Sequence, residues 1–316
     1  MFENGKMWAD DVGKPIQAHG GCIIQHDGMW YWYGEHKGAK NCPGTTRVDV
    51  IGISCYSSKD MNSWRYEGLA LDVKDSPKGS LIQPENVCER PKVLYNKKTG
   101  KFVMWMHLDT PNYTYAGVAV AVADRPIGPF TVIREMQPNR TDSRDMTLFK
   151  DVDGTAWLVH SSDWNKTLRL SRLTEDFTDV DGFYASALTD QTREAPALMY
   201  RDGKYYMITS GCTGWQPNSA LYAECDHLCG QWKLIDNPCE GDNYRRTFEG
   251  QSTYIFEKDG KTYLMLDHWK PKNLKNSGYS ILPVTVENGI LTVKWQATFP
   301  EQASKSGAFA PDIIIQ

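Results

Sequence analysis

The sequence predicts an all-β fold, a five-bladed β-propeller whose four-stranded antiparallel blades surround a central axis. One unit recurs five times along the 316 residues: an apolar strand, a turn that ends in Gly, and a strand rich in aromatic residues. Four of the five turns read Asp-Gly, which is a strong signal for a β-hairpin. The turn glycines stand 72, 54, 49 and 57 residues apart, a spacing typical of propeller blades, and are Gly28, Gly100, Gly154, Gly203 and Gly260.

The remaining elements follow each hairpin in order. The hairpins read CIIQHDGMWYWYGEH, KVLYNKKTGKFVMWMH, TLFKDVDGTAWLVHSS, ALMYRDGKYYMITSG and TYIFEKDGKTYLMLDH. The two strands after each are VIGISCYSS and WRYEGLAL, GVAVAVA and FTVIRE, TLRLSRL and a weak strand near Phe183, ALYAEC and WKLI, and YSILPVTV and ILTVKWQ. We therefore expect blades at approximately 13–75, 86–136, 142–188, 191–240 and 248–298 within a single domain, 1–316. A sandwich of two sheets explains the strands but not the fivefold repeat.

Polar residues stand at the start of the first strand of every unit. They lie nine residues before four of the turn glycines and eleven before Gly100, and they are His19, Asp145, Glu194, Gln251 and Glu89. The first strand of each propeller blade lines the central channel, so we expect these residues to meet at one end of it. Like charges held together cannot all ionise at their usual pH, so shifted pKa values are expected there, as at functional sites.

A structural reading of this ring remains open. Polar residues at strand starts also satisfy backbone groups, and propeller axes commonly hold water or a cation with oxygen ligands, such as calcium. We expect no required cofactor, with a structural calcium ion as the alternative. CDHLC carries half a zinc site in Cys225 and Cys229, but no second Cys or His pair follows at zinc-like spacing, so no metal ligands are assigned.

Paired carboxylates around a sugar carry out specific chemistry. One carboxyl, kept protonated, donates a proton to the glycosidic oxygen, while a second group activates water or attacks the anomeric carbon. Aromatic residues make up 12% of the chain, with 11 Trp and 16 Tyr, and a sugar-binding cleft needs such flat faces with polar edges. Both features favour glycoside hydrolysis.

Composition excludes other classes. The formal net charge of −4 lacks the basic surface that a nucleic-acid phosphate backbone demands, so no nucleic-acid partner is expected. No apolar run approaches the roughly 20 residues needed to cross a bilayer, so no membrane insertion is expected. The N-terminal MFENGKMWADD lacks the regions of a signal peptide. We expect a monomer that binds an oligo- or polysaccharide.

Several blocks of sequence resemble glycoside hydrolase family 43, and within it the exo-β-1,3-galactanase branch. They are PIQAHGGCI at 15–23, WYWYGE at 30–35, ERPKVLYN at 89–96, DMTLFKDVDG at 145–154, EAPALMY at 194–200, SGCTGW at 210–215 and GQSTY at 250–254. The resemblance implies an inverting hydrolase that releases galactose from the non-reducing end of β-1,3-linked galactan, such as an arabinogalactan backbone. Its members that act on plant polysaccharides are usually exported, which implies a periplasmic or secreted protein.

The resemblance also implies roles for single residues. Glu194 matches the general acid, and Asp145 matches the carboxylate that orients the acid and raises its pKa. The usual family member has an aspartate base on the first strand, where this chain has AHGG, and the galactanase-like branch suggests that Gln251 holds the water. A neutral amide is a poor proton acceptor, so Glu89 is the second candidate base.

Secondary sugar contacts are carried over in the same way, and two alternatives to the function stay open. The predicted substrate-binding residues are Gln17, His19, Glu35, Asn165, Thr213 and Trp215. An α-L-arabinofuranosidase or β-xylosidase of the same family is the first alternative. A carbohydrate-binding propeller without catalysis is the second, because the first-blade aspartate is missing.

Overall fold

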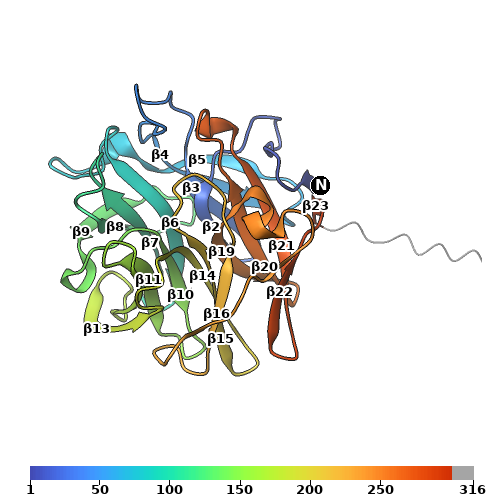
Figure 1. The fold of residues 1–316 in the computed structure, drawn as a ribbon. Helices are drawn as coiled ribbons and strands as arrows, with labels where there is room; N and C mark the ends of the chain where they lie inside the picture. Colours follow the sequence, from blue (N-terminus) through green and yellow to red (C-terminus); the bar gives the residue numbers. More distant parts are fainter. Residues whose placement is uncertain (301–316) are drawn as a thin grey trace, which may run out of the picture.

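The computed structural model describes residues 1–300 and contains five antiparallel blades arranged in a ring, which confirms the five-bladed β-propeller (Figure 1). The predicted single domain also includes residues 301–316, which lie outside the described residues. In each blade four strands pair in sequence order from the channel outward. Blade 1 contains β2 (His19–His26), β3 (Met29–Glu35), β4 (Gly52–Ser58) and β5 (Arg65–Asp72).

The next three blades repeat this order. Blade 2 contains β6 (Val87–Asn96), β7 (Lys101–Asp109), β8 (Gly117–Ala123) and β9 (Thr131–Met136). Blade 3 contains β10 (Met146–Lys150), β11 (Ala156–Ser162), β12 (Thr167–Leu173) and β13 (Val180–Ala187). Blade 4 contains β14 (Arg193–Arg201), β15 (Lys204–Gly211), β16 (Leu221–Cys225) and β17 (Lys233–Leu234), so the strand expected at WKLI is only two residues long.

Blade 5 differs from the four-stranded expectation. It contains β19 (Gln251–Lys258), β20 (Lys261–His268), β21 (Gly278–Glu287) and β22 (Ile290–Lys294), and β18 (Cys239–Glu240) adds a fifth strand parallel to β22. A two-residue strand without alternation gives no sequence signal of its own. Short 3-10 helices occupy Val73–Asp75, Pro138–Arg140, Tyr244–Glu249 and Leu274–Asn276.

The N-terminal segment closes the ring. β1 (Phe2–Glu3) pairs with β23 (Thr298–Phe299), and the amide of Asn4 donates to the carbonyls of Ile281 and Gln296. Trp8 packs between blades 1 and 5 in a buried aromatic cluster with Trp32 and Tyr279. The first and last blades are thereby joined, and the N-terminus lies beside β23 (Figure 1). Apolar clusters between adjacent blades hold the inner strands in place, so their N-terminal ends meet around the axis.

Candidate active site

A shared backbone irregularity presents the polar ring. Four of the five inner strands shift register just after the polar residue, at Glu89, Glu194, His19 and Ser252, the neighbour of Gln251. The residues that follow Glu89 and Glu194 take left-handed conformations, with φ of 54° at Arg90 and 51° at Ala195. Such conformations are costly outside Gly, and bulges re-aim side chains near active sites. The bulges thus distinguish the ring from ordinary strand starts.

Six of the ten predicted site residues line one cavity of about 260 Å³ at this end of the channel. They are Glu35, Glu89, Asp145, Glu194, Trp215 and Gln251. The other lining residues are Arg90, Tyr113, Gly214 and Trp269. All five blades therefore contribute to one pocket with carboxylates and aromatic faces, which is what recognition of a sugar requires.

The first carboxylate pair in the cavity is Glu194 with Asp145. Burial, and then the negative charge of Asp145, raise the pKa of Glu194 from 4.5 to about 8, against the opposing charge of Arg90. The guanidinium of Arg90 makes its ion pair with Asp145, with 2.8 Å between Nη2 and Oδ2. The cation contacts Asp145 and not Glu194, so Glu194 keeps a proton at neutral pH.

Gln251 is fixed by four hydrogen bonds. Its Nε2 donates to Oε1 of Glu194 at 3.1 Å and to the hydroxyl of Ser210 at 3.0 Å. Its Oε1 accepts from Arg90 at 2.6 Å and from the indole N–H of Trp269 at 2.9 Å. Both amide N–H groups and the carbonyl oxygen are in use, so the amide orientation is settled and the side chain holds the Glu194 carboxyl in place.

The second carboxylate pair is Glu35 with Glu89. Lys37 Nζ lies 2.6 Å from Oε2 of Glu35 and 3.6 Å from Oε1 of Glu89, and the backbone N–H of Arg90 donates to Oε1 of Glu35. Burial raises the pKa of Glu35, although Lys37 opposes the shift. Burial also acts to raise the pKa of Glu89, but Lys37, then His107 and Arg90, outweigh it and lower that pKa. Glu89 is therefore an ionised carboxylate.

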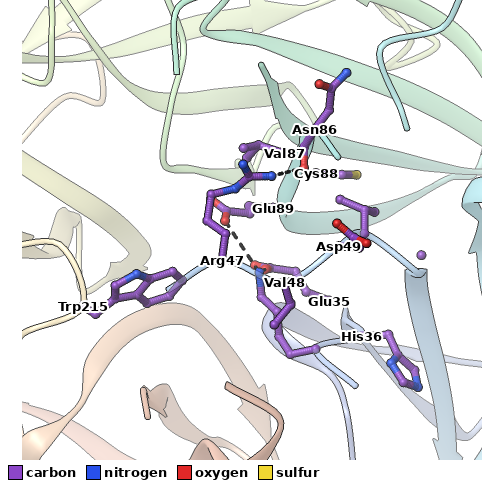
Figure 2. A pocket seen from close by; sticks show the side chains of 13 residues that line it. Glu35, His36, Arg47, Val48, Asp49, Asn86, Val87, Cys88, Glu89 and Trp215 are labelled. Carbon is purple, nitrogen blue, oxygen red and sulfur yellow. Dashed lines mark hydrogen bonds and ion pairs between the residues drawn. The ribbon is translucent and has the colours of Figure 1, made fainter. Parts of the chain in front are cut away.

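The segment between β3 and β4, residues 36–51, lies beside the cavity and lines a smaller hollow that shares Glu35, Glu89 and Trp215 with it. Arg47 in this segment donates to the carbonyls of Glu85 and Asn86, and Thr46 accepts from the indole N–H of Trp215. Figure 2 shows Arg47 reaching Asn86, with Glu35, Glu89 and Trp215 around the same small hollow of about 10 Å³. The segment from blade 1 thus ties blades 2 and 4 together beside the carboxylates.

The structure does not bring the remaining four predicted residues into the cavity. His19 is 0% exposed and lies between Asp267 and Tyr279, and Gln17 donates to the carbonyl of Lys275. Asn165 lies in the β11–β12 turn with φ of 64°. The hydroxyl of Thr213 donates to the carbonyl of Gln216 and accepts from Asn218. His19 is therefore a buried residue that contacts Asp267 and Tyr279 and does not reach the cavity. Thr213 is next to Gly214, which lines the cavity.

Four residues of this region were not predicted from the sequence. Arg90 directly follows Glu89 in ERPK. It lies in the bulge of β6 between Glu89 and Lys92, from which its side chain contacts Asp145. Tyr113 donates to Glu89 at 3.3 Å from the turn after β7, and Trp269 follows β20. Lys37 stands two residues beyond Glu35. Of these four residues, only Arg90 could have been found from the sequence, because it directly follows the predicted residue Glu89 in the ERPK motif.

Residues 1–300 form neither a metal site nor a membrane-spanning helix. No group of three or more His, Cys, Asp or Glu side chains there could hold a metal ion, and Cys225 and Cys229 are free thiols. None of the helices in the same range has the length and apolar character to span a membrane.

Solved structures with the same architecture carry related activities. A GH43 β-1,3-galactosidase, solved with galactodeoxynojirimycin, is 38% identical with a TM-score of 0.88, covering 94% of this chain and 99% of that one. An exo-β-1,3-galactanase from Phanerochaete chrysosporium, solved with galactose, is 33% identical with a TM-score of 0.85, covering 92% of this chain and 66% of that one.

Curated relatives are more distant and differ in their names. The β-D-galactofuranosidase xynD of Aspergillus niger is 24% identical over 226 residues, which are 68% of this chain and 65% of that protein. The chain thus spans just under two thirds of that relative. The extracellular exo-α-(1→5)-L-arabinofuranosidase ArbA of Cellvibrio japonicus is 22% identical over 303 residues, covering 85% of this chain and 79% of that protein.

The family model for glycosyl hydrolases family 43 matches residues 43–298, which include the whole of blades 2, 3, 4 and 5 and the two outer strands of blade 1. Together with the propeller and the carboxylate-lined cavity, this match shows that the chain belongs to glycoside hydrolase family 43.

Proposed function

We propose that the protein is an exo-acting, inverting hydrolase that releases galactose from the non-reducing end of β-1,3-linked galactan. The observation that carries this proposal is the cavity that Glu194 and Asp145, as an acid pair, line together with the ionised Glu89. Segment 36–51, which holds the lining residue Trp215 through Thr46, favours a pocket for a terminal sugar over an open groove. The likeness to solved β-1,3-galactosidases supports galactose as that sugar.

Glu194 serves as the general acid in this proposal. A carboxyl with a pKa of about 8 is protonated at neutral pH and can give its proton to the departing glycosidic oxygen. Asp145 maintains that pKa through its charge and stabilises positive charge that develops on the sugar ring in the transition state. Gln251 holds the Glu194 carboxyl by its 3.1 Å hydrogen bond, so the acidic proton is presented from a fixed position.

The contacts favour Glu89 as the group that accepts the proton of the attacking water. Gln251 already uses both amide N–H groups and its carbonyl oxygen, and a neutral amide is a weak base. Glu89 is ionised, and its contacts with Lys37, Tyr113 and His107 are long, at 3.6, 3.3 and 3.8 Å. Gln251 is then the positioning partner. In Glu89→Gln, added azide should restore turnover with an α-galactosyl azide product, whereas Gln251→Ala should not form this product.

A panel of substrates tests the specificity. Purified protein is incubated with β-1,3-galactobiose, β-1,4-galactobiose and nitrophenyl glycosides of galactopyranose, galactofuranose, arabinofuranose and xylopyranose. The proposal predicts free galactose from the β-1,3-linked disaccharide at the highest kcat/KM. Arabinose, xylose or galactofuranose release without cleavage of β-1,3-galactobiose would overturn it.

A furanosidase is the second candidate function. The observation that favours it is that both curated relatives are named for furanoside substrates, one galactofuranosyl and one arabinofuranosyl. The same acid pair serves either ring form, because the chemistry takes place at the anomeric carbon. The substrate panel distinguishes the two candidates by ring form alone.

We further propose that the enzyme is an exported monomer without a required metal. Activity should persist after dialysis against EDTA, and the purified protein should elute as one chain in light-scattering chromatography. Loss of activity that returns with calcium would contradict the proposed metal independence. Antibody detection in fractionated cells of the source organism should find the protein outside the cytoplasm.

A further inference from the structure

Lys37 lies behind the cavity, between two carboxylates from different blades. Its side chain is 9% exposed, and those of Glu35 and Glu89 are 5% and 16% exposed. Nζ also lies 5.9 Å from the ring centroid of Trp215, which comes from blade 4. One ammonium thus contacts three groups that line the cavity, while Lys37 itself lines only the small hollow of Figure 2.

Among residues 1–300, Glu35 and Glu89 have no lysine or arginine ion-pair partner other than Lys37. The guanidinium of Arg90 is used by Asp145, Gln251 and the carbonyl of Ser252. His107 lies 3.8 Å from Glu89 but is held at 3.1 Å by Asp109, which keeps it from serving Glu35.

We propose that Lys37 is a positioning residue that holds Glu35 and Glu89 as paired acceptors for the sugar and the attacking water, and that also fixes Trp215 at the cavity. This role rests on the function proposed above. Lys37 acts through the two carboxylates and the indole, and it touches neither substrate nor water.

The physical basis is the behaviour of two buried carboxylates without a counterion. Burial raises the pKa of Glu35 most, Lys37 opposes that shift, and the charge of Glu89 adds to it. Without Lys37, one carboxyl takes up a proton, becomes a hydrogen-bond donor and loses its value as an acceptor or base. The other ionisable groups around this pair are Arg90 and Cys88 on β6, His107 on β7, Tyr113 in the following turn, Asp145 before β10, and Arg47 and Asp49 in segment 36–51.

The test compares the kcat/KM of Lys37→Met with that of the unmodified enzyme on β-1,3-galactobiose from pH 5 to 8. The proposal predicts at least about a tenfold loss at pH 6, because an opposite charge typically shifts a carboxyl pKa by one to three units. The ratio to the unmodified enzyme should recover as pH rises and the protonated carboxyl ionises again. Lys98→Met, a control at an exposed ion pair, should match the unmodified enzyme throughout.

Rescue separates a charge role from a packing role. Methylammonium added to Lys37→Ala should restore at least about tenfold in kcat/KM, while methanol and sodium chloride should not. A loss that is constant with pH and insensitive to methylammonium would show that Lys37 only fills space, and would overturn the proposal.

A measurement without substrate keeps the inference separate from the proposed function. In protein with ¹³C-labelled Glu carboxyls, the signal of Glu35 or Glu89, assigned by single Gln variants, should titrate at higher pH in Lys37→Met than in the unmodified enzyme. If no galactoside is cleaved, this titration still decides the role of Lys37. Should Lys37→Met fail to fold, the double variant Glu35→Gln with Lys37→Met removes both charges and should fold. A Glu89 signal that titrates no higher in this double variant than in Glu35→Gln alone would contradict the proposal.

Discussion

The two carboxylate pairs of the cavity each contain two carboxyl groups, but they differ in where the nearby cation lies. In the pair Glu194 and Asp145, Arg90 makes its ion pair with Asp145 alone, and the pKa of Glu194 rises to about 8. In the pair Glu35 and Glu89, Lys37 contacts both members, and the pKa of Glu89 falls. Burial still raises the pKa of Glu35, although Lys37 Nζ lies closer to it than to Glu89. The comparison shows that burial and the placement of the nearby cation together set the pKa of each carboxyl.

The largest effect is expected from removing the proton donor. Glu194→Gln should lower kcat on β-1,3-galactobiose by about 10²–10⁴-fold, the usual contribution of general acid catalysis. A dinitrophenyl galactoside should lose far less, because its leaving group departs without a proton. Steady-state kinetics on both substrates check this, with the exposed surface variant Glu175→Gln as the control. Equal losses on both substrates would show that Glu194 is not the acid.

Removing the negative charge of Asp145 should make Glu194 easier to ionise, as Glu89 already is in the second pair. In Asp145→Asn the pKa of Glu194 should fall, since the charge of Asp145 raises it. Activity requires protonated Glu194 and is lost as pH rises through its pKa, so the alkaline limb of kcat/KM should move to lower pH. At pH 7 the loss should be roughly tenfold or more. An alkaline limb that stays in place in this variant would separate Asp145 from the acid.

The first pair should also lower the stability of the fold. Because the folded state raises the pKa of Glu194 from 4.5 to about 8, the folded state binds the proton more tightly than the unfolded chain. The stability that this proton contributes is fully present below about pH 4.5 and is lost as pH rises toward about 8. Glu194→Gln keeps a neutral side chain, so its Tm at pH 8 should exceed that of the unmodified enzyme by about 2–5 °C.

Calorimetric scans at pH 5 and pH 8 check this expectation. The gain in Tm should shrink at pH 5, where Glu194 is protonated in the folded enzyme. A gain of the same size at both values would assign it to something other than the buried charge.

The smallest effect is expected outside both pairs. Thr213 adjoins Gly214 at the rim, and its sugar contact remains a prediction from the resemblance. Thr213→Ala should raise KM by about two- to tenfold, the worth of one hydrogen bond, with little change in kcat. A loss in kcat as large as that of Glu194→Gln would place Thr213 in the catalytic machinery.

The sequence allowed the fold and the main ring to be predicted because both depend on local, repeating signals. The Asp-Gly turns set the strand register, and counting back from them reached Glu194 and Asp145. Lys37 and Trp269 follow strands in irregular segments, where no period places a side chain. The bulges after Glu89 and Glu194 shift the strand register within their blades, and no turn or repeat in the sequence marks them.

The same limit explains the residues placed outside the cavity. His19 occupies the ring position of blade 1, but its ring is taken up by Asp267 and Tyr279, which are far away in sequence. Asn165 and Thr213 lie in turns whose own hydrogen bonds or backbone conformation orient them. Position in a repeat therefore predicts which end of the channel a residue occupies, but not which way its side chain points.

The central claim is that the two pairs act from opposite faces of the sugar. The stereochemistry of the first product tests this claim most directly. Proton NMR spectra recorded within the first minutes of β-1,3-galactobiose cleavage follow the anomeric signals before mutarotation. The account predicts that α-galactose appears first and β-galactose only later. β-Galactose appearing first would reveal a covalent intermediate and contradict the separate roles of the two pairs.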